Sequence, residues 1–311
     1  MEGLSSSTEP SDMSFAELRK SLRKFRENGT RNAQLSYKLG KYACDNFSGK
    51  LGNEVWDVYE QMFFACIDLG INDVALSYLR QIKEQFPESK RVYRLIGILH
   101  EADGELAEAE ELYKEMLQEN PGDAAMSKRL ISMYKCNGKT VEAVKMLVSY
   151  LETYKCDHES WLELAEIYLS EYEYEKAAFC YEELILISPS NYLYHQRYAE
   201  VRFTIGGADN FLISKMHYCQ AARLSGNSSN RALLGLVTVC ETLKGLKGVT
   251  AEDKVSCFKL VQWAKEKLTV KYEKSKVEVS DTGPKKNSPK LTDHIDSGLE
   301  TVCAILDSVK L

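Results

Sequence analysis

The sequence repeats itself with a period of 34 residues, and this repeat constrains the fold more than any other feature. Alanines recur at this spacing at Ala75, Ala109, Ala143 and Ala177. Glycines and prolines follow the same period, at Gly70, Gly104, Gly138 and Gly206 and at Pro87, Pro121 and Pro189. Tyr172 and Lys155 occupy the vacant positions of the glycine and proline series. Three residue types that share one period indicate stacked copies of one small structural unit.

Each of these residue types suits one position in a pair of antiparallel helices. A glycine can adopt the left-handed conformation that ends a first helix. An alanine early in the second helix lets the two helices approach closely, and a proline after that helix prevents its continuation. In the fourth copy, Trp161 and Tyr168 share one face of the first helix, and Tyr181 reaches across from the second. This order of large, small and aromatic residues resembles the tetratricopeptide pattern, and it predicts an all-α tetratricopeptide-repeat superhelix (an α-solenoid).

The repeat also predicts how the chain is divided. Four regular repeats are expected over 56–191, at 56–89, 90–123, 124–157 and 158–191, and one or two degenerate repeats over 192–245. The capping-box pattern from Ser14 to Glu17 predicts the start of N-terminal helices over 14–55. The remaining expected segments are a disordered leader at 1–13, a C-terminal helix at 246–274, a flexible linker at 275–290 and a terminal helix at 291–311.

Composition excludes several classes of protein. The net charge of −6 and the pI of about 5.6 give no basic field for nucleic acid. No stretch approaches the roughly 18 apolar residues of a transmembrane helix, and the acidic, polar N-terminus predicts no signal peptide. The nine cysteines are scattered and never form a CxxC pair, which favours reduced thiols in a cytosolic compartment over disulfides or a zinc site.

The sequence shows no recognisable catalytic motif. The segment "NGKT" at 137–140 lacks the earlier glycine of a phosphate-binding loop, because Met133 stands in its place. The five histidines show no metal-binding spacing, and the acidic clusters follow the helical period of solvated faces. We therefore predict a protein that is not an enzyme and that has no cofactor and no metal.

A stacked helical array presents a concave groove lined by the first helix of each repeat, so partner-binding residues can be proposed by position. The middle of this groove is predicted to be basic and its C-terminal part acidic, which suits a partner segment of opposite pattern. Ordinary solvated helix faces remain the alternative interpretation. The Lys/Asn pair with which some chaperone-binding repeats hold a C-terminal carboxylate is absent from the corresponding positions. The candidate groove residues are Phe64, Arg91, Arg94, Ile98, Lys128, Arg129, Lys135, Glu163 and Glu166.

Segments that the general repeat does not require carry a narrower resemblance. These are "KLGNEVWDVYEQ" at 50–61, "KAAFCYEEL" at 176–184, "RYAEVRFTIGG" at 197–207 and "RALLGL" at 231–236. With "FRENGTRN" at 25–32, they resemble the family of subunit 2 of the endoplasmic reticulum (ER) membrane protein complex.

That resemblance implies a non-catalytic scaffold on the cytoplasmic face of the ER membrane, peripheral to it, that serves the insertion of transmembrane segments. The implied partners are an Oxa/YidC-type insertase subunit, a second membrane-embedded subunit and a soluble MPN-domain subunit, with no nucleic acid. The alternative is a soluble tetratricopeptide adaptor of a chaperone or of a cytosolic enzyme complex.

Overall fold

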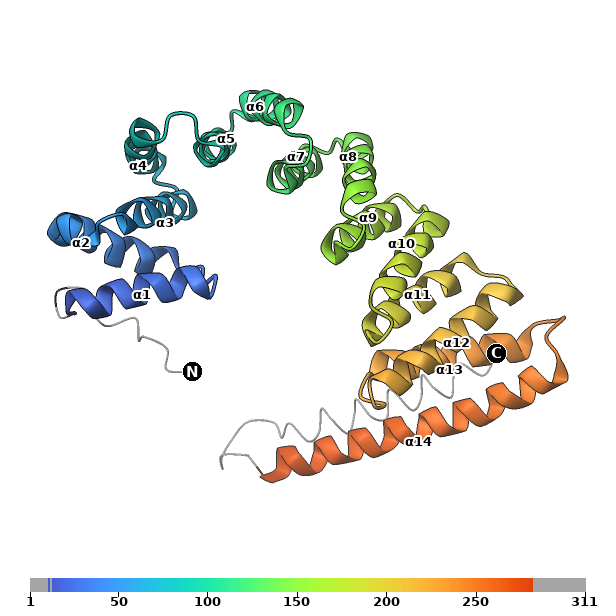
Figure 1. Cartoon of the computed structure of the whole chain (residues 1–311). Coiled ribbons are helices and arrows are strands. Elements are labelled where there is room, and N and C mark those ends of the chain that lie inside the picture. Colours follow the sequence, from blue (N-terminus) through green and yellow to red (C-terminus); the bar gives the residue numbers. More distant parts are fainter. Residues whose placement is uncertain (1–10, 12, 282–311) are drawn as a thin grey trace. The chain divides into compact units, whose positions relative to one another are not determined.

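The computed structural model describes residue 11 and residues 13–281 of the 311-residue chain. The regular structure of this part is helical throughout, which confirms the predicted all-α class (Figure 1). Its fourteen helices are α1 (Phe15–Glu27), α2 (Ala33–Leu51), α3 (Glu54–Asp68), α4 (Asn72–Gln85), α5 (Lys90–Asp103), α6 (Leu106–Glu119), α7 (Ala124–Cys136), α8 (Thr140–Thr153), α9 (His158–Ser170), α10 (Tyr174–Ile187), α11 (Tyr192–Ile205), α12 (Ala208–Leu224), α13 (Asn230–Gly245) and α14 (Ala251–Asp281).

The helices belong to two compact units, which divide within α8 between Met146 and Leu147. Each unit is described by itself below. Within the units, helices that follow one another in the chain pack together, for example α3 with α4 and α11 with α12. This contact pattern is the one expected of a repeat protein, in which each element touches its neighbours in sequence.

In the four regular repeats, the turns between the first and second helices share one range of φ angles. Gly70, Gly104 and Gly138 adopt φ angles of 71°, 82° and 67°. Tyr172, which interrupts the glycine series, adopts almost the same angle, 60°. A side chain in this left-handed region costs about 1–2 kcal/mol. The repeat geometry is therefore maintained even where the sequence departs from the pattern.

Small residues sit where the helices cross most closely. Ala75, Ala109, Ala143 and Ala177 are all completely buried. In the second repeat the close approach is made by Gly97 of α5, against which the hydroxyl end of the Tyr113 ring of α6 packs. Each fully buried aliphatic side chain around these crossings contributes about 1.5–3 kcal/mol. The alanine series is therefore a packing requirement of the helix pairs.

The N-terminal helices extend the first unit. In α1 the predicted capping box forms, with the Ser14 backbone N–H donating to Glu17 Oε2 (2.9 Å). Hydrogen bonds from Ser14 lower the pKa of the Glu17 carboxyl group. Leu18 and Leu22 of α1 are buried against Leu39 of α2 and residues of α3, in one apolar cluster. These helices therefore cover the α3 side of the first regular repeat.

The C-terminal helix is longer than predicted. We expected it to end at residue 274, but α14 continues to Asp281 and includes the first seven residues of the expected linker. The reason is that no proline or glycine stands between residues 275 and 281, and the first ones are Gly283 and Pro284. The rest of the expected linker, the expected terminal helix and almost all of the expected leader lie outside the described residues.

Two features are absent from the described residues. None of their helices has both the length and the apolarity that crossing a membrane requires. In the same part of the chain, no group of three or more histidine, cysteine, aspartate or glutamate side chains is arranged to hold a metal ion.

Candidate partner-binding site

Two arginines predicted to line the groove meet a buried carboxylate of the preceding repeat. Glu60 of α3, which is 9% exposed, forms an ion pair with Arg91 of α5. Arg94 Nη2 lies 3.7 Å from the other oxygen of the same carboxylate, and Arg91 also lies 3.8 Å from Asp57. The positive charge of α5 is thus largely compensated within the protein. Arg91 and Arg94 join two repeats, and they are not the freely available basic surface that we expected.

A polar cavity of about 350 Å³ lies elsewhere in the first unit. It is enclosed by the connection between α1 and α2, by α3 and by one side chain of α7. Gly29 in that connection adopts a φ angle of 59°, which allows the chain to turn sharply after α1. We call this space the arginine cavity, and its principal lining residues are Arg26, Arg31, Gln61, Phe64, Asp68 and Arg129.

The arginine cavity has an excess of positive charge. Among the described residues that line it, Asp68 is the only acidic one, and it is taken by Arg31, whose Nε donates to Oδ2 at 2.8 Å. This pairing lowers the pKa of the Asp68 carboxyl group. Arg26 donates to the neutral amide oxygen of Gln61 (3.1 Å). Arg31 and Arg129 thus have carboxylate partners, Asp68 and Glu101, whereas Arg26 is paired with a neutral group.

Arg129 is positioned in this cavity by a partly buried polar network. Its Nη1 donates to Glu101 Oε2 (3.1 Å), and the Tyr113 hydroxyl donates to the other oxygen, Oε1, at 2.6 Å. Burial, together with Glu101, raises the pKa of the Tyr113 hydroxyl, so this group stays protonated and acts as a donor. The carboxylate of Glu101 thus holds the Arg129 guanidinium in place.

The remaining candidate residues are placed as follows. Ile98 is only 5% exposed and belongs to a core cluster with Phe63 and Leu95, so the prediction that it is available to a partner is wrong. The apolar spacing of α5 points this residue inward, which its repeat position alone did not reveal. Four other candidates lie on first helices: half-buried Lys128 and exposed Lys135 on α7, and half-buried Glu163 and exposed Glu166 on α9 of the second unit.

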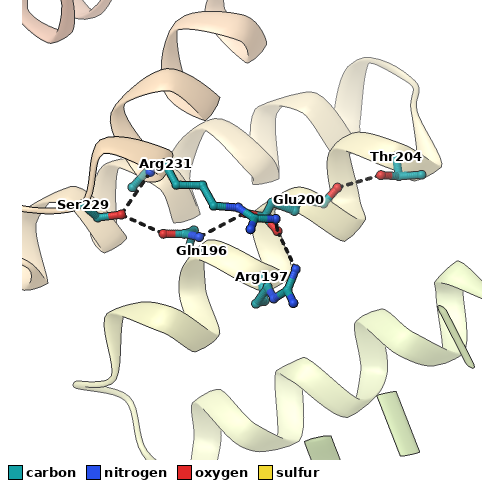
Figure 2. Close-up of polar contacts among 7 residues, drawn as sticks. Gln196, Arg197, Glu200, Thr204, Ser229 and Arg231 are labelled. Atoms are coloured by element: carbon teal, nitrogen blue, oxygen red, sulfur yellow. Dashed lines mark hydrogen bonds and ion pairs between the residues drawn. The ribbon is translucent and has the colours of Figure 1, made fainter. Parts of the chain in front are cut away.

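In the second unit, an acidic first-helix residue is also used within the protein. Glu200 of α11, which follows Glu166 by one repeat period, receives a two-pronged contact from Arg231 of α13 at 2.6 and 2.8 Å (Figure 2). Arg197 and Gln196 donate to the same carboxylate at 3.2 and 3.1 Å. Glu200 therefore connects α11 to α13 and is not an open acidic position.

Two histidines that are far apart in sequence meet in the second unit. The Nδ1 atoms of His195 and His217 lie 3.0 Å apart, and Nε2 of His195 lies 3.0 Å from the carbonyl oxygen of Pro189. A carbonyl oxygen only accepts, so His195 carries its proton on Nε2 and its Nδ1 accepts from His217. Burial lowers the pKa of His217 to about 4. His217 is therefore neutral at pH 7, and its ring stacks on that of His195 with centroids 5.2 Å apart.

Comparison with known proteins decides the family. The model of the EMC2 TPR-like repeat domain matches residues 74–214. Over 271 residues the chain is 37% identical to ER membrane protein complex subunit 2-B of Xenopus laevis, an alignment that covers 87% of this chain and 91% of the relative. The chain belongs to the ER membrane protein complex subunit 2 family. Subunit 2 of Dictyostelium discoideum is 29% identical over 262 residues, which cover 81% of each chain.

A solved structure supports the fold of this subunit 2 family member. The C-terminal part of a TPR repeat-containing protein from Cytophaga hutchinsonii matches it with a TM-score of 0.55 at 13% identity. The match covers 80% of this chain and 93% of that one. It confirms the predicted tetratricopeptide-repeat solenoid.

Sequence reasoning found only part of the arginine cavity of this subunit 2 family member. It named Phe64 and Arg129, because both lie on first helices in register with the repeat. It missed Arg26, Arg31 and Asp68. The two arginines belong to the segment "FRENGTRN", which supported the family resemblance but lies outside the 34-residue period. A cluster of arginines in a helix connection next to the first repeat was the available signal.

Proposed function

We propose that this chain is a non-catalytic scaffold subunit of the ER membrane protein complex, attached to the cytoplasmic face of the ER membrane. Its role would be to hold cytosolic segments of membrane-embedded subunits while transmembrane segments are inserted. The family, whose named members are subunits of this complex, and the solenoid fold support this proposal. The eight cysteines among the described residues are all free thiols, which suits a reducing compartment.

The arginine cavity is the observation that supports partner binding. A carboxylate placed between Arg26 and Arg129 would form charge-assisted hydrogen bonds with guanidinium groups that are already fixed by Gln61 and Glu101. Half-buried Phe64 lines the same space and offers an apolar contact. We therefore propose that the bound segment carries an acidic residue next to an apolar one.

The proposed sources of this segment are the Oxa/YidC-type insertase subunit and a second membrane-embedded subunit. A soluble MPN-domain subunit is proposed to bind elsewhere on the solenoid. No cofactor and no nucleic acid take part in this function. A scaffold of this kind needs shape and charge complementarity, and it needs no reacting group.

Membrane fractionation tests this function against the soluble alternatives. The full-length tagged chain is expressed in cells that lack the native one, and microsomes are washed with alkaline carbonate. We expect the chain to sediment with microsomes and to be released by carbonate. Purification in mild detergent should recover the membrane-embedded subunits with it. A chain that remains in the soluble fraction with a chaperone or a cytosolic enzyme would reject the proposal.

A further inference from the structure

The second unit contains an apolar hollow that the proposed function does not use. It has a volume of about 560 Å³ and lies between α8 and α10, with α9 forming its floor. We call it the α8–α10 hollow, and define it by Val148, Trp161, Tyr168 and Phe179. Trp161 and Phe179 meet edge to face, with ring centroids 6.2 Å apart, and the indole N–H donates to the Lys155 carbonyl oxygen at 2.8 Å. The aromatic walls are therefore held in place.

Large apolar side chains around this hollow are exposed. Phe179 is 53% exposed and Val148 is 41% exposed. Leu186, about two turns after Phe179 on α10, is 75% exposed. Phe179, Glu183 and Leu186 follow at intervals of four and three residues, so they share one face of the helix. Large apolar side chains that face water on one side of a helix are the kind of surface that marks an interaction site.

The repeat fold does not require apolar residues at these places, as the other repeats of the same chain show. The residues that precede Phe179 by one, two and three periods are Lys145, Glu111 and Ser77. Those that precede Leu186 in the same way are Glu152, Gln118 and Glu84. Polar side chains therefore satisfy the same structural positions elsewhere. The two exposed apolar residues of α10, Phe179 and Leu186, are therefore not explained by the repeat fold, and they are available to a partner.

The charges around the hollow indicate the chemistry of that partner. Three glutamates, Glu152, Glu175 and Glu183, line it against two lysines, Lys155 and Lys176. Two of these charges are engaged within the protein: Lys176 Nζ lies 3.3 Å from Glu173 and 5.6 Å from the centre of the Tyr168 ring, and Glu175 is paired with Arg202 at 3.2 Å. Glu152 and Glu183 then remain against Lys155. The surface offered to a partner is thus apolar in the middle and acidic at the edge.

We propose that the α8–α10 hollow binds an amphipathic helix of a partner protein, through a large apolar side chain that has lysine or arginine within one turn. A hollow lined by two helices and by aromatic side chains suits the helix-in-groove mode of recognition. Its volume lies within the range of pockets that enclose ligands, so it holds more than one side chain. This site is independent of the arginine cavity, which selects for a carboxylate.

Charge argues against two other occupants. Residues 291–311 of this chain carry four carboxylates, Asp293, Asp296, Glu300 and Asp307, against one lysine, Lys310. Such a segment would be repelled by the acidic edge of the hollow. An anionic lipid surface would be repelled in the same way. A second copy of the chain is the remaining rival, and the experiment below distinguishes it.

Photo-crosslinking of the full-length chain in cells tests the proposal. A photo-reactive benzoylphenylalanine replaces Leu186, and a matched probe replaces Gln118, the exposed residue two periods earlier. We expect the probe at 186, and not the probe at 118, to join a partner peptide that has a large apolar residue and a lysine or arginine within one turn. Crosslinks to residues 291–311, to a second copy or to lipid would overturn the proposal, as would no crosslink at all.

Charge variants then test the chemistry of the hollow. With the probe at 186, Phe179→Lys copies the residue of the preceding repeat, and Glu183→Lys reverses one edge charge. We expect each to lower the crosslink at least five-fold, and Lys155→Glu to raise it. Circular dichroism should show folded protein, because both positions tolerate polar residues elsewhere in the repeat. A crosslink that survives Glu183→Lys unchanged in the folded protein would refute a basic partner.

Discussion

The hydroxyl end of the Tyr113 ring on α6 packs closely against Gly97 on α5. A β-carbon added to Gly97 would stand 2.3 Å from Cε1 of this ring, which is closer than packed atoms can approach. The same relationship recurs in the second unit, where a β-carbon on Gly235 would stand 2.4 Å from the ring of Tyr218. Both tyrosines are buried. In these two places a glycine leaves the space that a buried tyrosine ring of the neighbouring helix occupies.

Gly97→Ala should therefore destabilise the first unit by about 1–3 kcal/mol, because the buried ring must move to make room for a methyl group. Thermal unfolding of the purified chain measures the effect. Replacing Tyr113 by leucine, which stands one period away at Leu79 and Leu147, should remove most of the added cost of Gly97→Ala. The two substitutions should therefore not be additive.

Gly49→Ala is the matched control for this prediction. Gly49 lies in α2, and nothing stands within 4 Å of a β-carbon built on it. Alanine there should be neutral or stabilising by up to about 1 kcal/mol. Equal destabilisation by Gly97→Ala and Gly49→Ala would show that the close approach of Tyr113 is not what limits position 97.

Lys155→Pro should fill the vacant place in the proline series without loss of stability. We expect the free energy of unfolding to rise by about 0.4–1 kcal/mol, because proline stiffens the unfolded chain. The turn at this point has the form of the proline-containing turns, with Asp157 N–H donating to the Tyr154 carbonyl (3.1 Å) as Ser89 N–H does to Phe86 (3.2 Å). Proline also has a backbone carbonyl, so residue 155 can still accept the hydrogen bond from the Trp161 indole N–H. Chemical denaturation measures the change.

Ser149→Pro, inside α8, provides the contrast and should cost about 3 kcal/mol or more. Similar losses for the two variants would mean that residue 155 is not in the joint between repeats.

The repeat predicted the helix pairs well because its causes are local and periodic. A glycine that turns the chain, an alanine under a crossing helix and a proline after it each act within a few residues of their own position. Tyr172 shows the limit of this reasoning: its side chain breaks the pattern while its backbone follows it. The end of α14 could not be placed in this way, because no period extends into residues 275–281.

The pair of His195 and His217 should make the second unit less stable in acid. Because burial lowers the pKa of His217 to about 4, the unfolded chain binds a proton there below about pH 6.5 while the folded chain does not. Stability is therefore present above pH 6.5 and is lost as the pH falls toward 4. Glu182 and Arg202 act on His217 in opposite directions and are weaker than burial and His195.

His217→Gln isolates this contribution, because glutamine retains a donor for His195 and does not titrate. The loss of unfolding free energy between pH 7 and pH 4.5, measured by urea titration, should be smaller in His217→Gln than in the wild type. His158→Gln, which removes a histidine outside the pair, should keep the wild-type pH dependence. An unchanged pH dependence in His217→Gln would contradict the assignment.

Only those residues of the candidate site whose position follows from the helix register could be predicted. Register places Phe64 and Arg129 on first helices, and both line the arginine cavity. Register does not say how far an arginine side chain extends, so the capture of Arg91 by Glu60 could not be foreseen. Helix register also does not apply to Arg31, which lies in the connection between α1 and α2, before the repeats, and pairs with Asp68 of α3.

The most direct test of the account neutralises the arginine cavity without disturbing its hydrogen bonds. In Arg26→Gln/Arg129→Gln, each glutamine keeps a donor for its partner, Gln61 or Glu101, while two positive charges are lost. Lys20→Gln/Lys24→Gln removes the same charge from exposed positions of α1 that do not line the cavity.

Each variant is purified from cells in mild detergent, and the membrane-embedded subunits that accompany it are quantified. Charged hydrogen bonds contribute about 1.5–3 kcal/mol each, so we expect the cavity variant to recover at least about ten-fold less of these subunits, while circular dichroism shows that it is folded. The control should recover them as the wild type does. Full recovery by a folded cavity variant would contradict the claim that this cavity holds the membrane partner.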